Sequence, residues 1–373
     1  MKLIIGGDLA IEDEVASAIE VGAGLHSSFA SVDYRILNLE CPCPTSKLDG
    51  IEKTGPVLIG GPANWKILEE LGIDLVTMAN NHCLDLGERG LIETMNGCCE
   101  RGIDYLGAGQ DLASAGSAKV IENDGIKLGL LNFGENEWAS ASRLNGGSNP
   151  YGVVRCARAV RELSTECDVT ILIIHGGHEH YELPSPRMVD EFRFFVEEGA
   201  DVVVCHHSHR LSGYEIYKNR PIFYGLGNFC FPRRVSDQKW FQGQLINLEI
   251  SGVGDIKWSL EFVGLDKKGW NLELLNGTDE WQKVRELSRI IKSNQELGKN
   301  WEAFVDHKKW EYSTVYRLAS FLPGRIPRAV MRRMGLDFIT QARASMLRLL
   351  NLVRCEAHLD VMRDVLRSSL KLK

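Results

Sequence analysis

The sequence predicts an α/β sandwich, and two patterns indicate this fold class. Apolar strand-like runs alternate with amphipathic helix-like segments from the N-terminus to about residue 230, and several runs are apolar at every position, as buried strands are. From Gln244 to Leu275, strand-like runs separated by glycine-containing turns predict antiparallel strands. We therefore expect one α/β domain over residues 1–277.

The elements before residue 230 are bounded by charged or turn-forming residues. Strands are expected near Lys2–Gly7, Tyr34–Leu39, Asp74–Ala79, Asp104–Gly107, Ala118–Glu122, Lys127–Phe133, Asp168–Ile174, Asp201–Cys205 and Pro221–Tyr224. Helices are expected over Pro62–Leu71, Glu88–Arg101, Arg155–Glu166 and Pro186–Gly199. Gly72, Gly102 and Gly199 stand where such helices end, because glycine adopts the left-handed conformation of a C-terminal cap.

Residues 278–373 are predicted to form a helical, basic extension. They hold 19 Lys and Arg against 11 Asp and Glu, a net charge of +8, whereas residues 1–277 carry −15. Between Arg325 and Arg354, arginines alternate with large apolar residues, so this segment would suit an anionic membrane surface or a partner in a synthesis complex. The alternative is a helical cap that packs its apolar face on the sandwich.

Composition and charge limit the class of protein further. The chain has 373 residues, 44% of them hydrophobic and 25% charged, with a net charge of −7, which is typical of a globular protein. A nucleic-acid partner is not expected, since no basic run is interleaved with aromatic residues. The N-terminus does not resemble a signal peptide, so a cytoplasmic location is expected, with the ten cysteines reduced and the extension available for membrane association.

The side chains best suited to bind a metal follow the ends of strand-like runs. His207 and His209 follow the apolar run at residues 200–204, and two imidazoles one residue apart suit a transition metal. Other candidates follow four more such runs, and they are Asp8, Glu40, Asn81, His82 and His175. Because ligands bind at the carboxyl ends of the strands in an open α/β sheet, we expect one shared site.

A site for two metal ions needs a bridging carboxylate, several imidazoles and one or two further oxygen ligands, and its ions lower the pKa of a bound water. Asp8 and Glu40 would supply the carboxylates and Asn81 a side-chain carbonyl, beside the three histidines at positions 175, 207 and 209. His82 would act as the general acid that protonates a leaving group. One or two divalent ions of Mn, Fe or Zn are expected in such a mixed site.

Each of these assignments has a structural alternative. Asp8 could cap the following segment, and Glu40 could be a solvated carboxylate before a turn. The Asn81 segment could be a plain turn, and His175 could be a core histidine with satisfied hydrogen bonds. The remaining histidines are expected to be loop, structural or exposed residues, and they are His26, His178, His180, His206, His307 and His358.

A series of short motifs in this order resembles a known family. The motifs are Gly7-Asp8, Asn38-Leu39-Glu40, Ala79-Asn80-Asn81-His82-Cys83-Leu84-Asp85-Leu86-Gly87, Gly107-Ala108-Gly109, His175-Gly176-Gly177-His178-Glu179, His206-His207-Ser208-His209 and Gly225-Leu226-Gly227-Asn228-Phe229. The chain resembles the bacterial capsule-synthesis CapA family, also called the poly-γ-glutamate synthesis PgsA-like family, a branch of the calcineurin-like metallophosphoesterases. The resemblance covers roughly residues 1–265 and implies a four-layer metallophosphoesterase-like α/β sandwich.

The resemblance also implies a role for each residue of the motifs. Asp8 would bind the first metal together with His209, and Glu40 would bridge the two ions. The second metal would be bound by Asn81, His175 and His207. His82 would be catalytic, with Asp85 as its orienting carboxylate. Three further residues would face the substrate or support the ligands, and they are Glu179, Asn228 and Asn80.

The sequence departs from the family pattern at two positions. Ala10 stands where other metallophosphoesterases have a histidine, as is typical of this branch, so the first metal would have one ligand fewer and bind weakly or not at all. Gly176 stands where the family usually has an aromatic residue, so the mouth of the site would differ.

Two functions from different classes follow from these expectations. In the first, the protein is a metal-dependent phosphoesterase-like hydrolase in capsule or poly-γ-glutamate synthesis, with a metal-bound hydroxide as nucleophile and an anionic polymer or phosphorylated precursor as substrate. In the second, it is a non-catalytic, metal-binding subunit of a polymer synthesis or export complex, docked through its basic helices.

Overall fold

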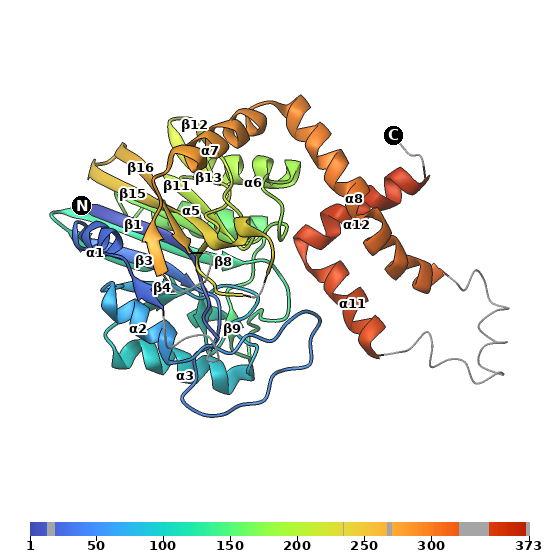
Figure 1. The fold of residues 1–373 in the computed structure, drawn as a ribbon, viewed down its shortest axis with the longest axis horizontal. Coiled ribbons are helices and arrows are strands. Elements are labelled where there is room, and N and C mark those ends of the chain that lie inside the picture. Colours follow the sequence, from blue (N-terminus) through green and yellow to red (C-terminus); the bar gives the residue numbers. More distant parts are fainter. Residues whose placement is uncertain (13–18, 234, 267–270, 321–342, 371–373) are drawn as a thin grey trace.

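The computed structural model describes residues 1–12, 19–233, 235–266, 271–320 and 343–370 (Figure 1). The described strands form two large sheets and one small ribbon. In Figure 1 the sheets lie together in one body, and the last helices extend from one side of it.

The first sheet has nine strands among the described residues, in the order β2-β17-β16-β15-β1-β3-β4-β5, with β14 also paired to β1. Its strands are β1 (Lys2–Leu9), β2 (Glu20–Val21), β3 (Tyr34–Leu39), β4 (Leu75–Thr77), β5 (Asp104–Leu106), β14 (Asn228–Cys230), β15 (Gln242–Gly252), β16 (Asp255–Leu265) and β17 (Asn271–Leu274). Strands β1, β3, β4 and β5 are parallel, and β15, β16 and β17 are antiparallel, as the sequence predicts.

The second sheet has the order β12-β13-β11-β10-β8-β7. Its strands are β7 (Lys119–Asn123), β8 (Ile126–Gly134), β10 (Val169–His175), β11 (Val202–His206), β12 (Tyr214–Tyr217) and β13 (Arg220–Phe223). The ribbon pairs β6 (Ala108–Gly109) with β9 (Gly147–Ser148). All seven residues of β10 are buried, which explains why this segment is apolar without alternation.

Five of the described helices before residue 200 cover the outer faces of the two sheets, and the short helix at Leu112–Ala115 packs on the ribbon instead. Together these helices are α1 (Ala23–Ala30), α2 (Pro62–Glu70), α3 (Gly87–Glu100), α4 (Leu112–Ala115), α5 (Val153–Ser164) and α6 (Pro186–Glu197), with a short 3₁₀ helix at Gln238–Phe241. Helix α6 begins where predicted, since Pro186 occupies its first turn and the Ser185 side chain accepts a hydrogen bond from the backbone N–H of Met188.

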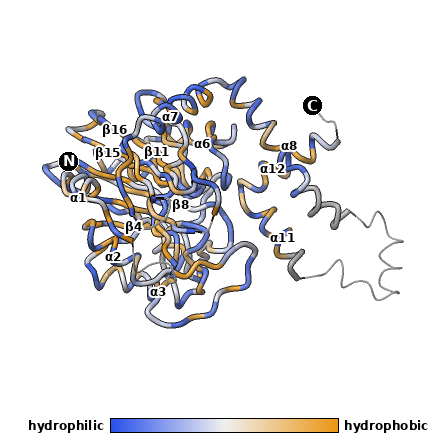
Figure 2. Tube along the Cα trace, in the orientation of Figure 1, coloured by the Kyte–Doolittle hydropathy of each residue, from blue (hydrophilic) through white to orange (hydrophobic). Residues whose placement is uncertain are grey.

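Three apolar clusters separate the layers. One lies between the first sheet and α1, α2 and α3, a second lies between the second sheet and α5 and α6, and the third joins the two sheets. In the third cluster, Ile5 and Ile36 of the first sheet pack with Ile171, Val202 and Val204 of the second. Figure 2 shows the hydrophobic colouring concentrated in this interior. The predicted four-layer α/β sandwich is therefore confirmed.

The extension begins with α7 (Thr278–Ile291), which packs into the sandwich through Val284, Leu287 and Ile291. Leu297, near the start of the next helix, belongs to the same cluster as the outer face of the second sheet, and the division at residue 277 stays a prediction. Helices α8 (Asn294–Ser320), α11 (Arg343–Arg354) and α12 (Glu356–Leu370) form an apolar cluster of their own, which includes Trp301 and Val361.

The predicted membrane-binding segment, 325–354, lies partly outside the described residues, which omit 321–342. In its described part, α11 exposes Leu349, Leu350 and Val353 and buries Asn351 and Leu352. Among the described helices, none is both long enough and apolar enough to cross a membrane.

Candidate metal centre

The predicted ligands meet at the carboxyl edge of the two sheets, and all of them are buried. Asp8 lies in β1, Glu40 follows β3, and Asn81 lies in the turn after β4. His175 is the last residue of β10, and His207 and His209 follow β11. The first sheet therefore supplies the oxygen donors and the second sheet supplies the imidazoles.

One group of donors forms around His175. Its Nε2 lies 3.1 Å from Asn81 Oδ1, 3.1 Å from His207 Nδ1 and 3.6 Å from Glu40 Oε1. The ligand atoms of Glu40, His175 and His207 all lie within 4.8 Å of one another. This spacing is compatible with a single transition metal, whose bonds to nitrogen and oxygen are about 2.0–2.2 Å long.

A second group forms around His209. Its Nδ1 lies 3.4 Å from Asp8 Oδ2, and its Nε2 lies 3.6 Å from Glu40 Oε1. The ligand atoms of Asp8, Glu40 and His209 also lie within 4.8 Å of one another. Glu40 belongs to both groups, which is the position that a bridging carboxylate would occupy. The roles of the individual ligands stay predictions.

The donor set fits a divalent cation. Both carboxylate oxygens of Glu40 are buried and have no hydrogen-bond partner among the described residues. Burial raises the pKa of Glu40 well above its usual value, and the nearby Asp8 carboxylate adds to this effect. For Asp8, burial also raises the pKa, but His209 and His175 outweigh it and lower the pKa. An unpaired buried carboxylate is costly, and a cation between the two groups would compensate it.

Two asparagines support the ligands from behind. The Asn38 side-chain amide donates to Asp8 Oδ1 at 2.8 Å and lies 3.3 Å from His175 Nδ1. Asn228 Oδ1 lies 2.9 Å from His209 Nδ1. Such contacts fix the orientation of ligating imidazoles and carboxylates. Asn228 was predicted as a site residue, whereas Asn38 appeared only as a position in the Asn38-Leu39-Glu40 motif.

Asn80 fixes the turn that carries Asn81 and His82. Its amide donates to the Leu39 carbonyl at 2.8 Å, and its side-chain oxygen accepts from the backbone N–H of His82 at 3.1 Å. This predicted residue therefore ties the turn after β4 to the end of β3.

His82 and Asp85 form a buried pair beside the centre. His82 Nδ1 lies 2.6 Å from Asp85 Oδ2, and the backbone N–H of Leu58 donates to the same oxygen at 2.7 Å. Burial lowers the pKa of His82, although Asp85 opposes this effect. Lys53 also belongs to this group, although it was not among the site residues predicted from the sequence. Its ammonium contacts both Asp85 and His82 Nδ1.

One histidine that was not predicted as a ligand lies in a strand and not in a loop. His206 was expected in a loop, but it is the buried last residue of β11, and its ligand atom lies within 4.8 Å of those of Asp8 and His175. Within the part of the chain that the structure describes, neither ring nitrogen has a partner with hydrogen-bond geometry, although the Gly6 backbone lies beside the ring. His178 is buried against Trp301 of α8.

The mouth of the site contains Glu179 and lacks an aromatic residue at Gly176. The Glu179 side chain is 49% exposed and lies close enough to His207 for each to shift the pKa of the other. A Cβ atom at Gly176 would lie 2.6 Å from Cγ of Glu135. The Glu135 side chain therefore fills the space that a larger residue at position 176 would need.

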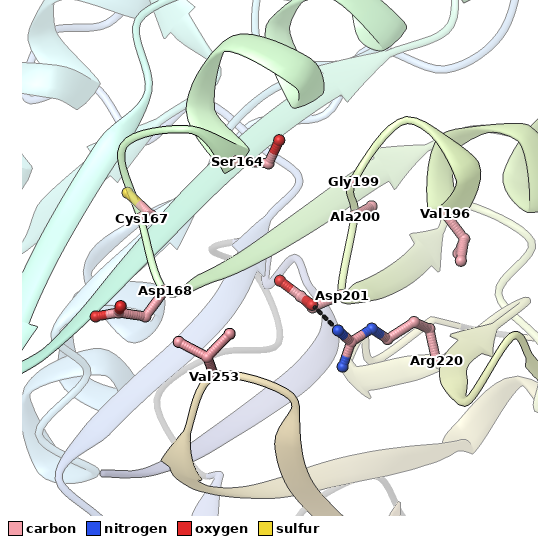
Figure 3. A pocket seen from close by; sticks show the side chains of 9 residues that line it. All are labelled: Ser164, Cys167, Asp168, Val196, Gly199, Ala200, Asp201, Arg220 and Val253. Carbon is pink, nitrogen blue, oxygen red and sulfur yellow. Dashed lines mark ion pairs between the residues drawn. The ribbon is translucent and has the colours of Figure 1, made fainter.

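A separate pocket lies at the opposite ends of β10 and β11 (Figure 3). Its volume is about 280 Å³, and its lining includes Cys167, Asp168 and Val253. The figure shows the ion pair between Asp201 and Arg220 on one side, with an N–O distance of 2.8 Å. None of the residues that line this pocket is a predicted site residue.

Gly7 permits the close approach that places Asp8. A Cβ atom at this position would lie 2.0 Å from the Gly227 carbonyl oxygen. We expect Gly7→Ala to force β1 away from the Gly227-Asn228 segment and to lower the free energy of unfolding by about 1–3 kcal/mol, as overpacking does. Urea denaturation would measure this change. Gly252→Ala, which has no atom within 4 Å of the added Cβ, is the control, and an equal loss in both variants would contradict the explanation.

Fold and site together define an α/β sandwich protein with a candidate divalent-metal centre at the carboxyl edge of its sheets. The chain belongs to the family described as bacterial capsule synthesis protein PGA_cap, whose model matches residues 2–233. The resemblance inferred from the motifs is thereby confirmed. Helices α8, α11 and α12 lie outside the matched residues.

Two curated relatives carry corresponding names. The capsule biosynthesis protein CapA of Bacillus anthracis is 32% identical over 181 residues, which are 47% of this chain and 43% of that protein. The PGA biosynthesis protein CapA of Bacillus subtilis is 29% identical over 178 residues, which are 47% of this chain and 46% of that protein. The matches thus span less than half the length of these relatives.

Solved structures with a similar chain path include two named enzymes. A novel phosphatase from Mycoplasma pneumoniae aligns with a TM-score of 0.39 and 13% identity, covering 73% of this chain and 90% of that one. A 5'-nucleotidase precursor from Thermus thermophilus aligns with a TM-score of 0.42 and 14% identity, covering 73% of this chain and 55% of that one.

Proposed function

We propose that this protein is a metal-dependent, phosphoesterase-like hydrolase that acts in capsule or poly-γ-glutamate synthesis. The observation that carries the proposal is Glu40, a buried carboxylate without hydrogen-bond partners among the described residues that is shared by two groups of imidazole and carboxylate donors. The family and the names of the curated relatives support the process. An anionic polymer or a phosphorylated precursor of it is the proposed substrate.

Six residues would hold one or two ions of Mn, Fe or Zn, and they are Asp8, Glu40, Asn81, His175, His207 and His209. When bound, such ions supply Lewis acidity toward a phosphoryl oxygen and activate water. The proton that the leaving group needs would come from a side chain of the protein. The Asp85 carboxylate accepts a hydrogen bond from Nδ1–H of His82, so that Nε2 of the protonated imidazole is the atom available to deliver a proton to the leaving group. Lys53 offsets part of the charge of Asp85.

We expect His82→Ala to lower hydrolysis about 10²- to 10⁴-fold, since general acids contribute rate enhancements of this size. The test combines elemental analysis of the purified protein with a phosphodiester assay in added Mn²⁺. The metal content should stay unchanged in His82→Ala, and His26→Ala, which alters a partly exposed histidine paired with Glu70, is the matched control. About two metals per chain with His82-dependent turnover support the proposal, whereas wild-type protein without turnover under any metal refutes it.

A second candidate function is favoured by the exposed apolar side chains of α11. Leu349, Leu350 and Val353 stand on a helix that also carries Arg348 and Arg354. This face would dock a non-catalytic, metal-binding subunit to a membrane surface or to a partner in the synthesis complex. Substituting the three apolar residues by Ser should then abolish recovery with the membrane fraction while metal content stays the same.

A further inference from the structure

The C-terminal helices contact a loop beside the metal centre, which we call the 135–138 loop because it comprises residues Glu135 to Trp138. The backbone and side-chain N–H groups of Asn136 donate to Glu356 of α12 at 3.0 and 2.5 Å. The Arg354 guanidinium lies 5.4 Å from the Trp138 ring centroid. Glu135 is linked to Asp360 of α12 through Arg187.

The third residue of this loop, Glu137, lies beside a predicted ligand. Its Oε1 is 3.9 Å from His207 Nε2, and its side chain is only 13% exposed. The other nitrogen of the same ring, Nδ1, lies 3.1 Å from His175 Nε2, inside one group of metal donors. The two nitrogens of His207 therefore face different partners, one facing the centre and the other facing Glu137.

Asn351 of α11 restrains Glu137 from the opposite side. Its side chain lies near enough to the Glu137 carboxylate to favour the ionised form and to lower the pKa of Glu137, against the larger effect of burial, which raises it. Asn351 is buried, and its Oδ1 has no hydrogen-bond partner among the described residues, so its amide nitrogen is the group available to donate to Glu137. A carboxylate held in this way can accept a hydrogen bond from an imidazole N–H and fix its tautomer.

We propose that the C-terminal helices act on the metal centre through Asn351, Glu137 and His207. Asn351 positions Glu137, and Glu137 accepts a hydrogen bond from the Nε2–H of His207, so that Nδ1 carries the lone pair that would bind an ion. Glu137 and Asn351 are thus positioning residues for the centre. This inference rests on the proposed function, because it requires that the centre bind a metal.

The experiment uses the full chain and measures Zn²⁺ affinity by calorimetry for wild type, Glu137→Gln, Asn351→Ala and the double variant. Loss of a group that orients a metal ligand typically weakens affinity about 10- to 100-fold, and we expect this loss for Glu137→Gln. Asn351→Ala should cause a smaller loss, and the double variant should equal Glu137→Gln, because the two residues act in series. Asn300→Ala, on the exposed face of α8, is the matched control.

A second readout separates positioning from a general loss of stability. The ¹⁵N chemical shifts of the Zn²⁺-loaded protein, labelled at histidine, report the tautomer of His207. Wild type should show a protonated Nε2, and Glu137→Gln should show altered or mixed signals at an unchanged melting temperature. Unchanged affinity and ¹⁵N shifts in Glu137→Gln would overturn the inference, and an effect of Glu137→Gln without any effect of Asn351→Ala would overturn the role of the extension. Wild type that binds no Zn²⁺ or Mn²⁺ would instead refute the proposed function.

Discussion

Replacing Arg187 by methionine is expected to lower the free energy of unfolding by about 3–5 kcal/mol, because it leaves buried carboxylates without their cation. The guanidinium donates to Glu135 at 2.8 Å, to Asp360 at 2.7 Å and to Glu191 at 2.6 Å. The side chains of Glu135 and Asp360 are only 6% and 3% exposed. This cluster joins α6, α12 and the 135–138 loop, so its loss should loosen the extension from the sandwich.

The effect of Arg187→Met should also depend on pH. Burial raises the pKa of Glu135 to about 7, although Arg187 opposes this effect, and removal of Arg187 would raise the pKa further. A carboxyl group whose pKa is higher in the folded state than in the unfolded state destabilises the protein at pH values above the unfolded-state pKa. This destabilisation decreases as the pH falls from the folded-state pKa toward the unfolded-state pKa. The loss should therefore be larger at pH 8 than at pH 5.

Urea denaturation at both pH values measures the loss. Arg289→Met is the matched control, because Arg289 forms ion pairs with Glu286 and Glu296 while 55% of its side chain is exposed. Exposed pairs contribute about 0–1 kcal/mol. Equal losses in the two variants would show that the buried cluster has no special role.

Replacing Glu40 by glutamine should have opposite effects on the metal-free and the metal-bound protein. Without metal, the substitution removes a buried carboxylate that lacks hydrogen-bond partners among the described residues, and we expect a gain of about 1–3 kcal/mol. Burial raises the pKa of Glu40, so the gain should be present at pH 8 and vanish toward pH 4, where the carboxyl group is protonated in both states. With metal, the variant should lose the donor shared by the two groups and most of its affinity.

Thermal unfolding with and without Mn²⁺ tests this prediction, together with elemental analysis. Glu122→Gln, on an exposed position of β7, is the control and should change neither quantity. A metal-free Glu40→Gln protein that is less stable than wild type at pH 8 would show that Glu40 has a structural partner in solution.

The sequence predicted the fold and the meeting of the candidate ligands at one edge because both depend on local patterns. Runs that are apolar at every position predicted the buried strands. Metal-binding side chains at the ends of these runs predicted one site at the carboxyl edge of the sheets. One boundary differs for a nonlocal reason. The first strand was expected to end at Gly7, but β1 continues to Leu9, since β14 pairs with Asp8 and Leu9 from more than 200 residues away.

The supporting residues were not predictable in the same way. Lys53 reaches Asp85 from a segment without regular structure, and no periodic pattern assigns such a residue to a site. Glu137 acquires its role only through contacts with α11, which follows it by more than 200 residues. His206 lies on the same face of β11 as Val202 and Val204 of the inter-sheet core. Because alternate residues of a strand share a face, the sequence would have predicted this position once the strand was known to extend to His206.

The division of donors between the two sheets gives any bound ion a mechanical role. Asp8 and Glu40 come from the first sheet, whereas the three histidines at positions 175, 207 and 209 come from the second. An ion bound by donors from both sets would therefore link the two sheets. An ion that binds only the folded chain stabilises it in proportion to the logarithm of its concentration over Kd, about 2.7 kcal/mol at a hundredfold excess. The concentration of the metal would then determine how long the protein resists proteolysis, independently of its catalytic activity.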